Sequence, residues 1–222
     1  MAVDLNSLPR MICLEDFGGN YAAFIDAVYQ VFFRDFMQHK AMFGSHRLHL
    51  RYHPAFQERP YAFYHMTHKG DIENDRLPDL RRCERIPWAR PTIEQAEELG
   101  LRFWEQTERR NGRRICIWLD VDNGDDYFVI LYVHRNYVRL LTAFYGDSPN
   151  YAKKRKKEYE EWKANVGRDF TPDELVSEKH QLPPPLGPRQ RQFFCHTRPD
   201  RASVILRRSR RIYFVYSPIL RN

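Results

Sequence analysis

The chain has 222 residues, of which 42% are hydrophobic and 14% aromatic, which is typical of a folded globular protein. Its mean hydropathy is −0.70. No apolar run approaches the roughly 20 residues that a membrane-spanning helix needs, so we expect no membrane partner. The first residues lack a basic stretch followed by an apolar core, which argues against a signal peptide. The four cysteines are widely spaced, which argues against a disulfide framework or a zinc site and fits a reducing cytoplasm.

The net charge of +7 is unevenly distributed. Residues 186–222 contain nine arginines and one acidic residue, which gives +8 there and leaves about −1 for the rest of the chain. Prolines crowd the segment just before this basic end and exclude it from a helix or a sheet. We therefore expect a single domain over residues 1–181, followed by a Pro-rich linker and a basic C-terminal arm over 182–222, with a terminal hairpin as one form of that arm.

The first half of the chain predicts a helix and two strands. Apolar residues recur at helical spacing over 20–37, and Asn20 is suited to cap the helix. Residues 47–53 alternate between apolar and polar side chains, which favours a half-buried strand. We expect residues 61–68 to form a second strand, paired with the first in a loose hairpin. Residues 69–88 have no clean period and predict an ordered loop or a short helical turn.

The second half predicts a meander between helices. Pro91 suits a helix start, and apolar spacing extends that helix over 91–110. Three strands follow at 115–119, 127–133 and 137–145, and their short connections require antiparallel neighbours. Ser148 and Pro149 begin a helix that ends before Gly167, and a short helix opens near 171. The expected fold class is α+β, with a small antiparallel sheet, made of a hairpin and a three-strand meander, packed against helices.

The order of four segments resembles a known family. FYHMTHKG, DRLPDLRRCERIPW, LLTAFY and KKRKKEYEEW follow one another between residues 45 and 165 as in phage- and plasmid-associated ribonuclease toxins of the barnase–EndoU–colicin–RelE fold group. Thr142 to Tyr145 stands where that group has a threonine–alanine–tyrosine-like strand ending, with Phe144 in place of the usual tyrosine. The resemblance implies an intracellular toxin that cleaves RNA without a metal or cofactor, with an antitoxin as a partner.

Such cleavage needs a base, an acid and cations around the phosphate. His65 is the first candidate, because an imidazole with a pKa near 6.5 can exchange protons at neutral pH; a packed histidine is the alternative. On a strand, Thr67 would share the face of His65 and contact RNA. His68 would point the other way, where it either packs at a turn or contacts RNA. Paired with Asp71 and Glu73, the two histidines would instead suggest a metal site.

Arginines and hydroxyls supply the remaining candidates. Arg82 and Arg85 suit a catalytic role at the phosphate and Arg81 an RNA contact, since guanidinium forks match phosphate oxygens; ion pairs with neighbouring acids are the alternative. Thr142 and Tyr145 end the late strand and would contact the phosphate or orient a catalytic group, unless Thr142 is an ordinary sheet threonine. Arg139 would lie on the opposite side from Thr142.

Two basic segments complete the candidate RNA-binding set. The run from 153 to 157 contributes Lys153, Lys154 and Lys156, which either grip phosphates or form a solvated helix face. The C-terminal arm contributes arginines interleaved with aromatic residues, a pattern that suits a single strand, an acidic antitoxin or a guarded sheet edge. These arginines are Arg207, Arg208, Arg210 and Arg211.

The leading hypothesis is therefore a metal-independent endoribonuclease toxin that uses 2′-hydroxyl attack. The alternatives are a non-catalytic nucleic-acid- or partner-binding protein of a mobile element, and a metal-dependent nuclease.

Overall fold

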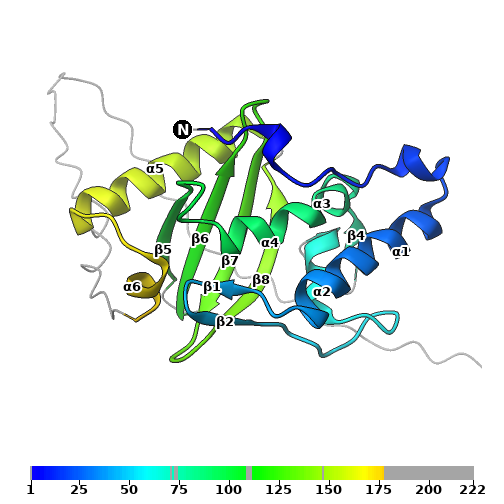
Figure 1. The fold of residues 1–222 in the computed structure, drawn as a ribbon, viewed down its shortest axis with the longest axis horizontal. Helices are drawn as coiled ribbons and strands as arrows, with labels where there is room; N and C mark the ends of the chain where they lie inside the picture. The colour runs from blue at the N-terminus through cyan, green and yellow to red at the C-terminus, as the bar shows by residue number, and fades with distance from the viewer. Residues whose placement is uncertain (1, 71, 73–74, 109–111, 147, 178–222) are drawn as a thin grey trace, which may run out of the picture. The chain divides into compact units, whose positions relative to one another are not determined.

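The computed structural model describes residues 2–70, 72, 75–108, 112–146 and 148–177, all within one unit, Met1–Leu182 (Figure 1). The predicted linker and basic arm, including Arg207, Arg208, Arg210 and Arg211, lie outside the described residues, as do Asp71 and Glu73. Within the described ranges, no helix is both long enough and apolar enough to cross a bilayer.

Helices and strands alternate irregularly along the chain. The longer helices are α1 (Tyr21–Phe32), α4 (Ile86–Glu94) and α5 (Pro149–Val166), and α1 continues into a wider π-helical segment, η3 (Phe33–Gln38). The short helical elements are η1 (Leu5–Ser7), η2 (Leu14–Phe17), α2 (Tyr61–Thr67), α3 (Leu80–Glu84) and α6 (Pro172–Ser177). The strands are β1 (Met42–Phe43), β2 (His46–His49), β3 (His68–Lys69), β4 (Leu77–Pro78), β5 (Arg102–Glu108), β6 (Gly112–Asp120), β7 (Asp126–Val133) and β8 (Val138–Tyr145).

The main sheet among these residues has six strands in the order β1-β2-β8-β7-β6-β5, and β3 with β4 forms a separate two-stranded ribbon. β5 to β8 form an antiparallel meander, whereas β2 pairs in parallel with the start of β8. The predicted α+β class is correct. The sheet is larger than expected, and it is mixed, because β2 joins β8 and does not pair with residues 61–68.

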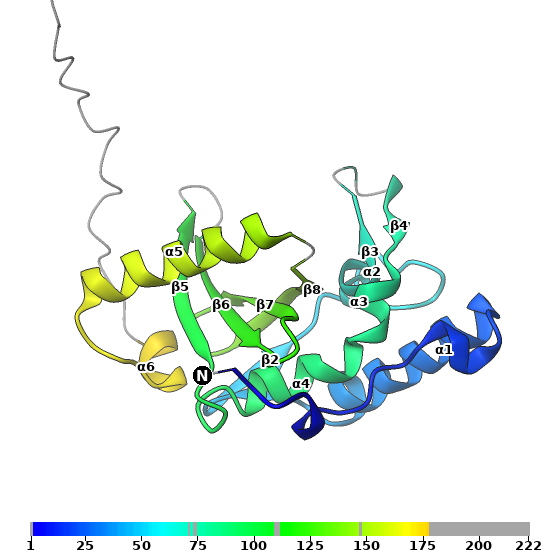
Figure 2. The same cartoon turned by 90° about the horizontal axis from the view of Figure 1, so that it is seen from above.

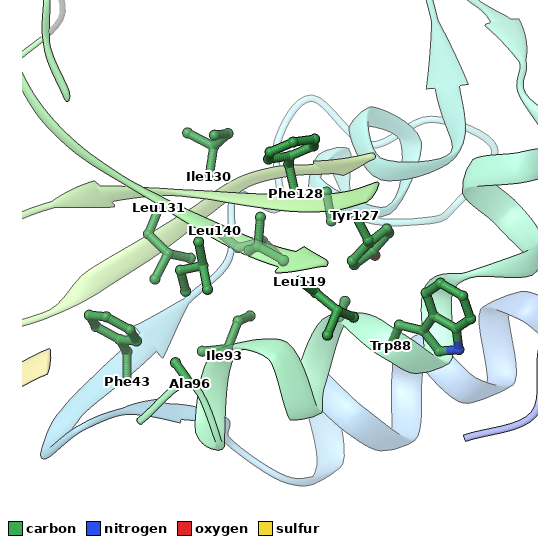
Figure 3. Packing of buried hydrophobic residues seen from close by; sticks show 14 of the residues in the cluster. Phe43, Trp88, Ile93, Ala96, Leu119, Tyr127, Phe128, Ile130, Leu131 and Leu140 are labelled. Atoms are coloured by element: carbon green, nitrogen blue, oxygen red, sulfur yellow. The ribbon is translucent and has the colours of Figure 1, made fainter. Parts of the chain in front are cut away.

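Helices cover both faces of the meander. Figure 2 shows α5 on one face and α4, with α1 beyond it, on the other, while α2 and α3 gather beside β8. In Figure 3, Leu119, Leu131 and Leu140 point toward α4, and Ile130 points toward the opposite face. Each of these four side chains is at most 7% exposed, so the sheet is buried on both sides where helices cross it.

Residues 61–68 are a helix for most of their length, so the strand prediction is wrong. Nearly every side chain of α2 is buried, because the helix lies among α1, α3 and β8. The ring of Phe63 packs 5.0 Å from Tyr29 and 5.2 Å from Phe32. A short apolar run buried on all sides has no alternation that would distinguish a strand from a helix.

The helix predicted over 91–110 is also wrong. α4 begins earlier, contains Pro91 near its end, and stops at Glu94. Gly100 has φ +60, a left-handed conformation that favours glycine, and the chain then enters β5. The apolar residues of this region belong to the end of α4, a turn and the start of β5. Their spacing happens to match that of one continuous helix.

Local end signals were read correctly. The side chain of Asn20 accepts a hydrogen bond from the backbone N–H of Ala23 at the start of α1. Ser148 caps α5 in the same manner through Asn150, and Gly167 ends that helix with φ +70. These positions depend only on neighbouring backbone, which explains why sequence predicted them.

Candidate functional site

A cleft of about 340 Å³ lies between α2 and the part of the sheet formed by β6, β7 and β8. Three of its lining residues are arginines, and none of the described residues along it is acidic. The lining consists of Arg51, Tyr61, Ala62, His65, Arg114, Ile130, Arg139, Leu140, Leu141 and Thr142. Three cations along one cleft favour an anionic ligand.

Strand register places two of the arginines in one cross-strand row. Arg114 pairs with Tyr132, which pairs in turn with Arg139. The guanidinium of Arg139 lies 5.2 Å from the centre of the Tyr132 ring. Its Nε is buried without a hydrogen-bond partner among the described residues. The row therefore places Arg114 and Arg139 on the strands to either side of Tyr132, with the Arg139 guanidinium beside its ring.

A β-bulge determines which side chains of β8 face this cleft. Ile130 pairs with Thr142 but Leu131 pairs with Leu140, so Leu141 is the extra residue. Arg139 and Thr142 therefore share the face of Ile130, while Leu140 points toward α4 (Figure 3). The prediction that Arg139 lies on the side away from Thr142 is wrong, because strict alternation does not survive a bulge.

Helix α2 brings His65 to the same cleft. The His65 ring lies 5.6 Å from that of Tyr61, one helical turn earlier, and the guanidinium of Arg51 stacks 4.0 Å from the same Tyr61 ring. The hydroxyl of Thr142 donates a hydrogen bond of 3.3 Å to the backbone carbonyl of His65. His65 and Thr142 therefore lie along the same cleft, but the threonine hydroxyl contacts the backbone of the helix that carries the histidine.

The arginines on α3 and directly after it form a different cluster around the end of β8. The Tyr145 ring lies 5.2 Å from the Arg81 guanidinium and 4.6 Å from that of Arg85. Arg85 is buried and pairs with Asp125 at 2.8 Å and with Glu84 at 3.3 Å. Burial and internal partners argue against the predicted catalytic role of Arg85.

Arg82 also has internal contacts. Its guanidinium donates to the carbonyl of His68 at 3.2 Å and lies 3.6 Å from Asp79. None of Arg81, Arg82 and Tyr145 lines the cleft that contains His65. The expected convergence of the arginine trio with His65 is therefore not observed, since α3 packs at the far end of β8.

Thr67 and His68 also lie away from the cleft. Thr67 is fully buried and its hydroxyl donates to the carbonyl of Phe63 at 2.8 Å, so the predicted RNA contact is wrong. The His68 ring packs 4.3 Å from Tyr64 and lines a separate cavity of about 100 Å³. Burial lowers the pKa of His68 below its usual value, and the cationic Arg76 nearby adds to that effect.

The basic run lies on α5, with its lysines exposed. Lys154 lines a second cleft beside the first, whereas Lys153 and Lys156 line neither. Arg155, in the middle of the run, turns inward and donates to the Tyr151 hydroxyl at 2.7 Å and to Glu158 at 2.6 Å. The run is thus partly a solvated face and partly a wall of that second cleft.

Sequence reasoning missed three residues of the site, Arg51, Arg114 and Arg139. Arg139 follows a buried valine and precedes two leucines in β8, and this contrast was the available signal; Arg114 follows Arg113 at the start of β6 and stands out less. An arginine retained among buried neighbours needs an anionic or aromatic partner. Arg51 follows β2 and carries no comparable signal.

No group of three or more His, Cys, Asp or Glu side chains is arranged to hold a metal ion among the residues that the structure describes. Comparisons with known proteins find no matching family model, no similar curated protein and no similar solved structure.

Proposed function

We propose that the protein is a metal-independent endoribonuclease and that its active site is the cleft between α2 and the sheet. The observation that carries this proposal is the convergence of an imidazole and three guanidinium groups on one cleft. Guanidinium groups bind phosphate oxygens in a planar fork, and an imidazole is the side chain best suited to move protons near pH 7.

The residues would divide the reaction as follows. His65 accepts the proton of the 2′-hydroxyl, and the 2′-oxygen forms a bond to phosphorus. The bond from phosphorus to the 5′-oxygen breaks, and this oxygen takes a proton from solvent. Arg114 and Arg139 stabilise the negative charge that grows on the phosphate oxygens. The products would be a 2′,3′-cyclic phosphate and a 5′-hydroxyl, and DNA would not be cleaved because it lacks the 2′-hydroxyl.

The biological setting that we propose is an intracellular toxin with an antitoxin partner. The resemblance of segment order to ribonuclease toxins supports this setting, as does the +8 charge of residues 186–222, which suits an acidic protein or RNA.

A second candidate is a nucleic-acid-binding protein without catalysis. It is favoured by the presence of only one imidazole among the residues described along the cleft, and by the contact of Thr142 with backbone. In that case the arginines would hold a phosphate that is not cleaved.

The test is incubation of the purified chain with a single-stranded RNA of mixed sequence in EDTA, followed by analysis of the product ends. Cleavage with cyclic phosphate ends is expected, and His65→Ala should reduce the rate at least 100-fold, in the usual range for loss of a general base. His68→Ala is the matched control, because it removes the same side chain one turn away and outside the cleft.

RNA that stays intact at every pH with correctly folded protein would refute the proposal. Retained binding under those conditions would support the second candidate. Cleavage that disappears in EDTA and returns with a divalent cation would support a metal-dependent nuclease.

A further inference from the structure

A second cleft, of about 470 Å³, runs between α5 and the sheet and is richer in aromatic side chains. Its aromatic lining is Trp104, Phe144, Tyr151 and Trp162. Its volume lies within the roughly 300–1,000 Å³ of typical small-molecule sites. The reaction proposed above does not use the aromatic side chains of this cleft, so their arrangement needs a separate explanation.

Two of the four tryptophans point to a ligand. Trp88 and Trp118 use their indole N–H groups within the protein, donating to the Pro9 carbonyl at 2.9 Å and to Asp126 at 2.7 Å. Trp104 and Trp162 are only 1% and 7% exposed, yet their buried Nε1 atoms have no hydrogen-bond partner among the described residues.

Buried donors are nearly always satisfied, so two exceptions around one cleft suggest an acceptor that the protein itself does not supply. Trp104 gives the stronger evidence for a ligand in this cleft, because it lines no other cavity among the described residues. Trp162 also borders a neighbouring hollow. A purely apolar ligand would leave these donors unpaired and is therefore disfavoured.

The wall formed by α5 is fixed before any ligand binds. Arg155 stacks 4.7 Å from the Tyr151 ring, donates to its hydroxyl, and pairs with Glu158, which in turn accepts from the Gln106 amide at 2.9 Å. Burial raises the pKa of Tyr151 to about 12, so its hydroxyl stays protonated at neutral pH. A preorganised wall of this kind reduces the entropy lost on binding.

The two clefts are neighbours, because Arg114 and Ile130 line both. A phosphate held at Arg114 would therefore have aromatic side chains within reach of the group attached to it. In a nucleic acid, that group is a ribose carrying a base. Lys154 lines the same cleft and offers a cation for a neighbouring phosphate. The three glutamates that also line the cleft are each paired with a cation: Glu105 with Arg113, Glu158 with Arg155 and Glu161 with Lys157.

We propose that the α5 cleft binds a nucleobase of the RNA whose adjacent phosphate lies at Arg114. The ring packs against the aromatic side chains, as bases do on single-strand-binding proteins, and one of its carbonyl or ring-nitrogen acceptors takes the N–H of Trp104. This inference rests on the proposed function for the identity of the ligand, and it adds the part of the substrate that the protein recognises.

The test is titration of the ¹⁵N-labelled full chain with the four ribonucleoside monophosphates and, separately, with inorganic phosphate. The indole N–H signals of Trp104 and Trp162 should shift with at least one nucleotide and remain in place with phosphate, while those of Trp88 and Trp118 stay unchanged throughout. Trp104→Phe should weaken nucleotide binding roughly 3- to 10-fold, the effect of one hydrogen bond.

Trp118→Phe is the matched control, since it removes an indole from the same face of the sheet outside the cleft and should leave the affinity unchanged. A second pair avoids the core. Lys154→Ala should weaken binding, and Lys40→Ala, which removes the same charge from an exposed position outside the cleft, should not.

Equal shifts of all four indoles, or nucleotides that bind no more tightly than phosphate, would overturn the inference. The readout is binding and not cleavage, so the two proposals can fail separately. Nucleotide binding at Trp104 without RNA cleavage would refute only the proposed function, and cleavage without indole shifts would refute only the nucleobase site.

Discussion

Replacing Arg139 tests whether the cleft stabilises a growing negative charge. Arg139→Gln keeps most of the length of the side chain and removes its charge. Because the Nε of Arg139 has no hydrogen-bond partner among the described residues, the substitution strands no donor or acceptor in the folded protein. We expect the fold to tolerate it and the reaction to slow.

The magnitude follows from charge and distance. Cleavage adds about one negative charge to the phosphate oxygens in the transition state, and a guanidinium in hydrogen-bond contact has its charge about 4 Å away. At an effective dielectric constant near 20 this interaction is worth about 4 kcal/mol. Solvent at the open side of the cleft reduces it to about 2–3 kcal/mol, which corresponds to a roughly 30- to 150-fold lower kcat/KM.

The assay is the rate of cleavage of a short fluorescent RNA in EDTA at fixed ionic strength. Arg135→Gln is the matched control, because it removes the same charge from an exposed turn outside the cleft. If kcat/KM of Arg139→Gln stays within threefold of wild type, or if both variants slow equally, the cleft does not act through this guanidinium.

Two further predictions concern stability. Asp125→Ala should lower the free energy of unfolding in urea by about 3 kcal/mol, because it leaves the buried Arg85 with only Glu84 as an acidic partner; a change below about 0.5 kcal/mol would contradict this. The lowered pKa of His68 means that the unfolded chain binds its proton more readily than the folded protein does. Stability should therefore fall as pH drops below about 6.5, and His68→Gln should reduce that fall in urea midpoints measured at pH 7.5 and 5.5; an unaltered pH dependence would refute this assignment.

Local chemistry in the sequence determined much of the framework. Asn20, Ser148 and Gly167 act on adjacent backbone, so α1 and α5 begin, and α5 ends, where these residues indicate. The Asn123–Gly124 pair predicts the tight connection between β6 and β7, and the Asn123 side chain accepts from the N–H of Asp125 at 2.9 Å. These features need no information from distant parts of the chain.

The sequence predicted His65 and Thr142 as candidates, as a titratable side chain and a strand-end hydroxyl, and both line the same cleft. The sequence did not predict that these two residues are in contact. The 3.3 Å hydrogen bond between them joins residues 77 positions apart, and it depends on residues 61–67 forming a helix beside β8. Residues 61–67 form a helix and not the predicted strand. Neighbouring elements bury α2 on all sides, so its sequence lacks the alternation that would have distinguished the two.

The cationic side of the site depended entirely on tertiary structure. The bulge at Leu141 places Arg139 on the face of the sheet opposite to the one that strict alternation predicts. The pairing of β6 with β7 and of β7 with β8 then places Arg114 in the same cross-strand row as Arg139. The arginines that are adjacent in sequence, on α3, instead pack against Tyr145 and internal acids. The sequence identified the kinds of residues that a phosphate site needs. Only the folded sheet decided which of them lie together, because strand register joins residues that are far apart along the chain and local propensity does not specify it.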